Sequence, residues 1–234
     1  MKETKLHKHL QTLKKNLAPM TWPQRFDHIW TYYKEMIIIT VVTLTVVIGV
    51  GVSVLTPKKD LVMGGLLVNT FFNEEAETYL TEELLAQLDG NAKTQEAKIY
   101  TKTFTDPNAS EQDGYVLTTI FAMMYAEQVD YVLMDEVGLK AMIQMQGLLD
   151  MNEVFTPEEM EQLQDRFFYG QQQDDDGNLV GDPIPMAMKV SDVPFIKECE
   201  KYNYRDVYLG FAINAPNQDS LRGFWDYFLA WEKQ

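Results

Sequence analysis

The sequence predicts an α/β fold with a mostly parallel sheet covered by helices, preceded by one transmembrane helix. An uncharged run occupies residues 36–56, and beyond it short apolar runs alternate with segments of helical period. Alternating strands and helices favour a parallel sheet, because each crossover helix returns the chain to the same edge. We therefore expect an arm at residues 1–35, a transmembrane helix at 36–56 and an α/β domain at 57–234.

The uncharged run reads MIIITVVTLTVVIGVGVSVLT and is about 31 Å long as a helix, enough to cross a bilayer. It is apolar on every face, unlike a core helix. The long basic segment before it and the absence of a small-residue cleavage site after it favour an uncleaved signal anchor. Thr45, Gly49 and Ser53 recur every four residues, a spacing that permits self-association of such helices and that also arises by chance.

The charges predict the orientation of the protein in the cell membrane. The first 35 residues carry seven Lys or Arg and three Asp or Glu, net +4, whereas the remainder carries 13 and 32, net −19. Basic residues stay on the cytoplasmic side, so we expect a single-pass protein with a cytoplasmic N-terminus and an extracytoplasmic C-terminal domain. The acidic balance of that domain argues against nucleic acid as its ligand.

The arm is predicted to be basic and amphipathic. Leucines fall at helical spacing among lysines over residues 6–17, which is typical of a helix lying on an anionic bilayer surface. The alternative is a basic tail that only sets the topology. Thr21 followed by Pro23 predicts a second helix start, and the apolar face of that helix suits the membrane interface.

The outer domain is predicted to consist of alternating strands and helices. Its 177 residues, from Lys58 onward, suffice for one hydrophobic core. Thr156 and Pro157, followed by two acids, are a strong helix start. The predicted strands are 61–69, 97–104, 130–134 and 207–213. The predicted helices are 74–88, 114–128, 136–146, 156–168 and 218–231.

One part of this domain resembles a known family. The segment AEQVDYVLMDEVGLKAMIQMQGLLDMNEVFTPEEMEQL at residues 126–163 resembles the first lobe of extracellular solute-binding proteins. In that family an aspartate precedes a strand, here at residues 130–135, and a helix then leads to a Gly-Leu-Leu turn, here at 147–151. The segment WPQRFDHIWTYYKE at residues 22–35 is similar to membrane-anchored proteins of Gram-positive bacteria that carry such a domain. The resemblance implies a single solute-binding-type lobe.

Asp135 and Glu136 are candidate ligand contacts. They follow the predicted strand 130–134, and open parallel sheets place ligands at the carboxyl ends of their strands. The alternative is an acid pair at the start of the next helix. Tyr204 is a third candidate, because aromatic rings in its neighbourhood would stack on a sugar or a peptide. Trp225 and Phe228, three residues apart, are predicted to be core residues.

No catalytic residue, metal or cofactor is predicted. All three histidines lie in the arm, which removes His-based triads and Cys–His pairs from the outer domain. Cys199 is the single cysteine, and we expect it to be buried and apolar in character. A calcium loop built on Gly177 would place Gln172 and Pro183 at positions that require carboxylates, so a turn between two extended segments is favoured.

The sequence thus favours a membrane-anchored extracytoplasmic binding or interaction module of solute-binding type, with an unidentified ligand. The alternative is a structural or accessory subunit of an envelope or transport complex that binds no small ligand. In either case the partners are the lipid bilayer and a transporter or other envelope protein. An enzyme is not expected.

Overall fold

The computed structural model describes residues 18–55, 59–105, 110–173, 178–201 and 206–231. The chain divides into two compact units, Met1–Pro57 and Lys58–Gln234. The amphipathic helix predicted within residues 1–17 lies outside the described residues.

The first unit contains one long helix, α2 (Trp22–Leu55). It begins where the sequence predicts, since the Thr21 amide donates a 3.0 Å hydrogen bond to Oε1 of Gln24, and the Arg25 amide donates to the Thr21 carbonyl. The predicted interfacial helix and the predicted span are therefore one continuous helix. Among the described residues, α2 alone is long and apolar enough to cross a membrane, which is consistent with single-pass anchoring.

The small residues proposed for self-association lie on α2. The Thr45 hydroxyl donates 2.9 Å to the carbonyl of Val41, in the preceding turn, and nothing lies within 4 Å of a Cβ added to Gly49. The side chain of Ser53 is outside the described part of the chain. Self-association through this face stays a prediction.

The second unit is built from six strands and a set of mostly short helices. The strands are β1 (Asp60–Val68), β2 (Gln95–Lys102), β3 (Tyr131–Met134), β4 (Phe167–Gln173), β5 (Leu179–Lys189) and β6 (Tyr208–Phe211). The main helices are α3 (Glu74–Thr78), α4 (Leu84–Gln87), α5 (Glu111–Tyr125), α6 (Glu136–Gln144), α7 (Pro157–Gln162), α8 (Pro194–Cys199) and α9 (Gln218–Leu229). A π-helical turn, η1 (Tyr79–Glu83), joins α3 to α4, and 3₁₀ turns η2 (Met151–Glu153) and η3 (Gln164–Arg166) flank α7.

The six strands form one mixed sheet in the order β2-β1-β3-β6-β5-β4. β1 pairs in parallel with β2 and with β3, whereas the three remaining pairs are antiparallel. The expectation of a mostly parallel sheet is therefore not confirmed beyond β1, β2 and β3. Only residues 174–178 separate β4 from β5, too few for the crossover that a parallel pair needs, so these strands form a hairpin.

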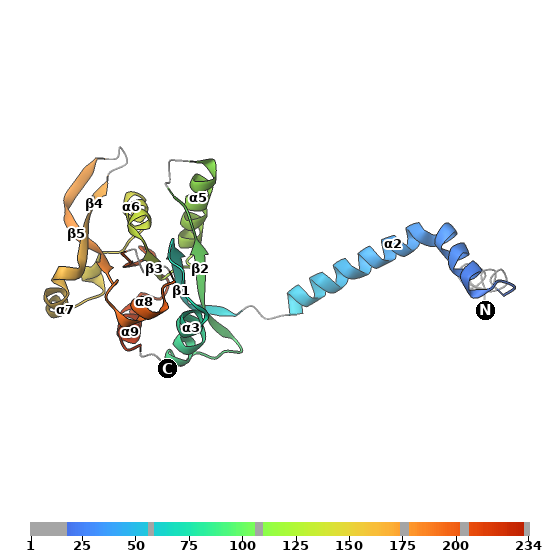
Figure 1. Ribbon diagram of the computed structural model, residues 1–234, viewed down its shortest axis with the longest axis horizontal. Coiled ribbons are helices and arrows are strands. Elements are labelled where there is room, and N and C mark those ends of the chain that lie inside the picture. Colours follow the sequence, from blue (N-terminus) through green and yellow to red (C-terminus); the bar gives the residue numbers. More distant parts are fainter. Residues whose placement is uncertain (1–17, 56–58, 106–109, 174–177, 202–205, 232–234) are drawn as a thin grey trace, which may run out of the picture. The chain divides into compact units, whose positions relative to one another are not determined.

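Helices cover both faces of the sheet (Figure 1). α3, α8 and α9 gather on one side of the strands, and α5 and α6 lie on the other. On the first face, the ring of Tyr131 stacks on Phe224 of α9 with 4.0 Å between centroids. On the second, α6 approaches β1 so closely that a Cβ added to Gly138 would lie 2.8 Å from the Val68 side chain.

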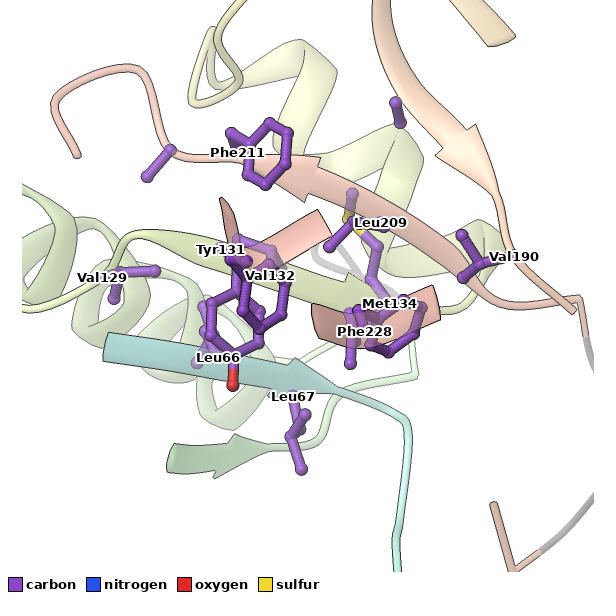
Figure 2. Close-up of a cluster of buried hydrophobic side chains, with 14 of the residues drawn as sticks. Leu66, Leu67, Val129, Tyr131, Val132, Met134, Val190, Leu209, Phe211 and Phe228 are labelled. Carbon is purple, nitrogen blue, oxygen red and sulfur yellow. The ribbon is translucent and has the colours of Figure 1, made fainter. Parts of the chain in front are cut away.

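β3 lies at the centre of the core, as Figure 2 shows. All four of its residues are fully buried, which confirms the prediction for this strand, because helices cover both of its faces. Trp225, Phe228 and Cys199 are also buried core residues, as predicted.

Two tyrosines connect the first helical segment of the domain to the last. The Tyr79 hydroxyl donates to the carbonyl of Tyr227 at 2.7 Å, and the Tyr227 hydroxyl donates to the carbonyl of Tyr79 at 2.9 Å. Their rings stack with 4.3 Å between centroids. Burial raises the pKa of Tyr79 to about 12, so this reciprocal pair stays protonated at neutral pH.

Candidate functional site

The carboxyl ends of β1 and β3 hold a buried polar network. Asp135 follows β3, is 4 % exposed and caps α6, with its Oδ1 accepting from the Gly138 amide at 2.9 Å. The same oxygen accepts from Nδ2 of Asn69, which follows β1, at 3.1 Å. Oδ1 of Asn69 in turn accepts from the Phe104 amide at 3.0 Å. The network thus ties the ends of three neighbouring strands together.

Among the described residues, the second predicted contact, Glu136, does not join this network. Glu136 is exposed in the first turn of α6 and pairs with Lys140 one turn later at 2.5 Å, which raises the pKa of Lys140. Tyr204 lies outside the described residues. The arrangement of Asp135 and Glu136 is that of an acid pair at a helix start, the alternative that the sequence left open. Their role as ligand contacts stays a prediction.

Substitutions at Asp135 and Glu136 should have different effects on stability, because Asp135 caps a helix and Glu136 is exposed. We expect Asp135→Ala to lower the free energy of unfolding by about 1–3 kcal/mol, because the Gly138 amide and the Asn69 amide group lose their acceptor. Asp135→Asn should cost less than about 1 kcal/mol, since asparagine also caps helices. Glu136→Gln should change it by less than about 0.5 kcal/mol. Urea unfolding of the three variants checks this; a silent Asp135→Ala would contradict the capping role.

A second polar cluster lies before β3. The Asp130 carboxylate is fully buried and accepts from the amide of Gly64 at 2.7 Å, from the amide of Asn217 at 2.9 Å and from its Nδ2 at 3.2 Å. Burial raises the pKa of Asp130, and the three hydrogen bonds oppose that shift. Through these hydrogen bonds the carboxylate connects β1 to the start of α9, which indicates a structural role.

An exposed apolar surface lies on the outer side of α5. Tyr125 is 80 % exposed, Tyr115 74 % and Phe121 44 %. A hollow of about 280 Å³ opens beside the end of the helix, and a shallower groove of about 470 Å³ runs along it. The two share Phe121, Tyr125 and Met145 and form one continuous surface, here named the α5 groove. Its remaining lining residues are Gly114, Leu117, Thr118, Ala122, Met124, Gln146, Gly147, Ile213 and Asn214.

The α5 groove is lined mainly by apolar side chains, with Thr118, Gln146 and Asn214 as its polar ones. Asn214 donates from Nδ2 to the Met124 carbonyl at 2.5 Å, whereas its buried Oδ1 has no hydrogen-bond partner among the described residues. The segments that form the groove and its rims, 111–130, 141–151 and 206–220, contain no Lys or Arg and several acids. The lining of the groove therefore carries no charged side chain, and the segments that supply it are acidic in composition.

The sequence did not predict this groove. The residues on the inner side of α5 were enough to explain the helical pattern, so the apolar residues on its outer side were not considered. Ile120 and Met124 are buried against the sheet, as the helical period indicates. The signal that remained was a second apolar side formed by Leu117, Phe121 and Tyr125, at spacings of four residues. A surface helix with two apolar sides has more apolar surface than one sheet face covers.

No group of three or more His, Cys, Asp or Glu side chains in the described ranges is placed to hold a metal ion. Comparison of the chain with protein-family models, with curated proteins and with solved structures found no match. The resemblance to solute-binding proteins therefore stays a prediction.

Proposed function

We propose that this protein is a single-pass, membrane-anchored interaction module whose extracytoplasmic α/β domain docks a partner protein through the α5 groove. The observation that carries the proposal is an exposed, uncharged apolar groove on a domain that is otherwise strongly acidic. Contiguous apolar surfaces of this kind mark interaction sites, whereas single exposed apolar residues do not. The role proposed is that of an accessory subunit in a membrane or envelope complex.

The membrane topology in this proposal follows from the sequence. The net charge of +4 before the span and −19 after it favours a cytoplasmic N-terminus. Only residues 56–59 separate α2 from β1, so a partner of the domain would act at the membrane surface. The lack of histidine in residues 57–234 supports binding in preference to acid–base catalysis.

Solute binding is the second candidate, and the strand order favours it. β1 lies between β2 and β3, so the crossover after β1 leads to one side of it and the crossover after β2 returns to the other side. Open sheets bind ligands outside the carboxyl ends of the strands at such a switch point. Asn69, Thr70 and Asp135 lie there. Because Oδ1 of Asp135 and both amide atoms of Asn69 already have partners within the fold, we place docking through the α5 groove first.

A cysteine placed in the groove tests both docking and orientation. Cys199 is buried, so Ala122→Cys would supply the one accessible thiol of the described residues. Intact cells are treated with a membrane-impermeant reagent that carries a maleimide and a photoreactive group. We expect labelling without permeabilisation and, after illumination, a discrete cross-linked product with one partner protein.

The matched control is Gln162→Cys, an exposed position at the end of α7 and away from the groove. It should be labelled to the same extent without yielding that product. Labelling that requires permeabilised cells would contradict the orientation. Efficient labelling of Ala122→Cys without a discrete product, or the same product from both positions, would contradict docking through the groove.

A further inference from the structure

We infer that the occupant of the α5 groove is a helical segment of the partner, with one apolar face and Lys or Arg residues at its flanks. The inference rests on the proposed function and specifies the partner's chemistry. Three properties of the groove carry it: its length and period, the size of the residues on its floor, and the sign of the charges around it.

The groove has the shape that a helix requires. Its lining residues on α5 run from Gly114 to Tyr125, about 17 Å along the helix axis, or three turns. They are spaced by three and four residues, which is the period at which one helix packs against another. A partner helix of about four turns would cover the whole groove.

The floor of the groove allows a helix to approach closely. Gly114, Thr118 and Ala122 follow one another at four-residue intervals, and nothing lies within 4 Å of a Cβ added to Gly114. Phe121 and Tyr125 also line the groove, and their rings stack with 6.2 Å between centroids. Large side chains of a partner helix would pack over the small residues and against the aromatic ones.

An extended peptide does not suit this surface. Peptides that add to a sheet use the unpaired backbone groups of an edge strand, and β2 and β4 are the edges here. α5 can contact a partner only through its side chains, because its backbone groups are hydrogen-bonded within the helix. Side-chain packing in a groove is the mode by which amphipathic helices bind.

The charges select a basic partner and disfavour a second copy of this chain. Glu111 and Asp113 lie at one end of α5, Glu127 follows the other, and no Lys or Arg occurs between residues 111 and 130. Two α5 grooves packed together would bring these acids against one another across domains of net charge −19. Lys or Arg at both flanks of an apolar helix would complement the acids instead.

Three synthetic 18-residue peptides test this inference on the full chain in zwitterionic phosphatidylcholine nanodiscs, with empty nanodiscs as the blank. The first carries leucines at helical period with lysines elsewhere, the second has glutamates in place of the lysines, and the third has serines in place of the leucines. Amide hydrogen exchange in α5 reports binding at the groove. We expect protection with the Leu/Lys peptide only, and about threefold or greater weakening between about 50 and 500 mM salt.

A pair of variants assigns the effect to the groove. Ala122→Arg puts a large cation onto the floor, and we expect it to raise the Kd of the Leu/Lys peptide by about tenfold or more. Gln162→Arg adds the same charge to α7, away from the groove and from the acids at the ends of α5, and it should change the Kd by less than about threefold. Both positions are exposed, so neither variant should impair folding.

The outcomes distinguish this inference from the proposed function. Equal protection by the Leu/Glu peptide would overturn the charge requirement, and protection by the Ser/Lys peptide would overturn the apolar one. If no peptide protects α5 while Ala122→Cys still yields its cross-linked product, the partner is not a basic amphipathic helix and the docking function stands. If both experiments fail, the inference and the proposed function fall together.

Discussion

Replacing Asp130 by alanine is expected to lower the free energy of unfolding by about 3–5 kcal/mol. The substitution leaves three donors without an acceptor: the buried amide of Gly64, and the partly buried amide and Nδ2 of Asn217. It also removes the link between β1 and the start of α9. Urea unfolding of the full chain in detergent, followed by tryptophan fluorescence, measures the change, with exposed Glu161→Ala on α7 as the control at less than about 0.5 kcal/mol.

The free energy of unfolding should depend on pH differently in the wild type and in Asp130→Ala. The pKa of Asp130 is higher in the folded protein than in the unfolded chain, so the folded state retains the proton to higher pH. The stabilisation by Asp130 is therefore full below the unfolded-state pKa and declines as pH rises through the folded-state pKa. We expect the gap in stability between wild type and Asp130→Ala to narrow across this acidic range. A gap that widens with pH would show that hydrogen bonding outweighs burial at this carboxylate.

Leu133→Ala is expected to cost about 2–5 kcal/mol. Leu133 is fully buried in β3, where it pairs with Leu67 of β1 on one side and with Leu209 of β6 on the other. Truncation removes apolar contacts and leaves a cavity that a close-packed centre fills only in part. Leu179→Ala, at an exposed position of β5, is the matched control and should cost less than about 0.5 kcal/mol.

The measurement is again urea unfolding, with midpoint and slope determined for each variant. A loss of less than about 1 kcal/mol for Leu133→Ala would mean that β3 is not packed between two helical layers. An equal loss for Leu179→Ala would mean that the end of the hairpin belongs to the core.

Local pattern was enough to predict most of the elements. The strand predicted at 61–69 is β1 and that at 130–134 is β3, since buried strands leave apolar runs between turn residues. Whether strands pair in parallel or antiparallel was not predictable in this way, because an apolar run carries no information about which strand lies beside it. Neither β4 nor β5 was among the predicted strands, although an extended segment was expected on each side of the turn at Gly177. The glutamines and glycine of β4 do not look like a buried strand, and the helix predicted at 156–168 covered its first two residues.

The candidate site was predicted only in part. Asp135 at the end of β3 was predicted as a functional position from the strand alone, and the structure shows its capping role. Its partner Asn69 is 66 residues away, and no sequence period relates the two. The α5 groove depends on which side of a helix the sheet leaves uncovered, which is decided by tertiary packing and not by the helix itself.

The position of β6 has a consequence for biosynthesis. Of the strands in the described residues, β6 is the last to be made and the one that joins the β4–β5 hairpin to β3. While the chain emerges from N- to C-terminus, the three parallel strands and the hairpin are complete before the strand that unites them exists. The two halves of the sheet therefore expose unpaired edges until residue 211 has been made, and closure of the sheet has to wait for nearly the whole domain.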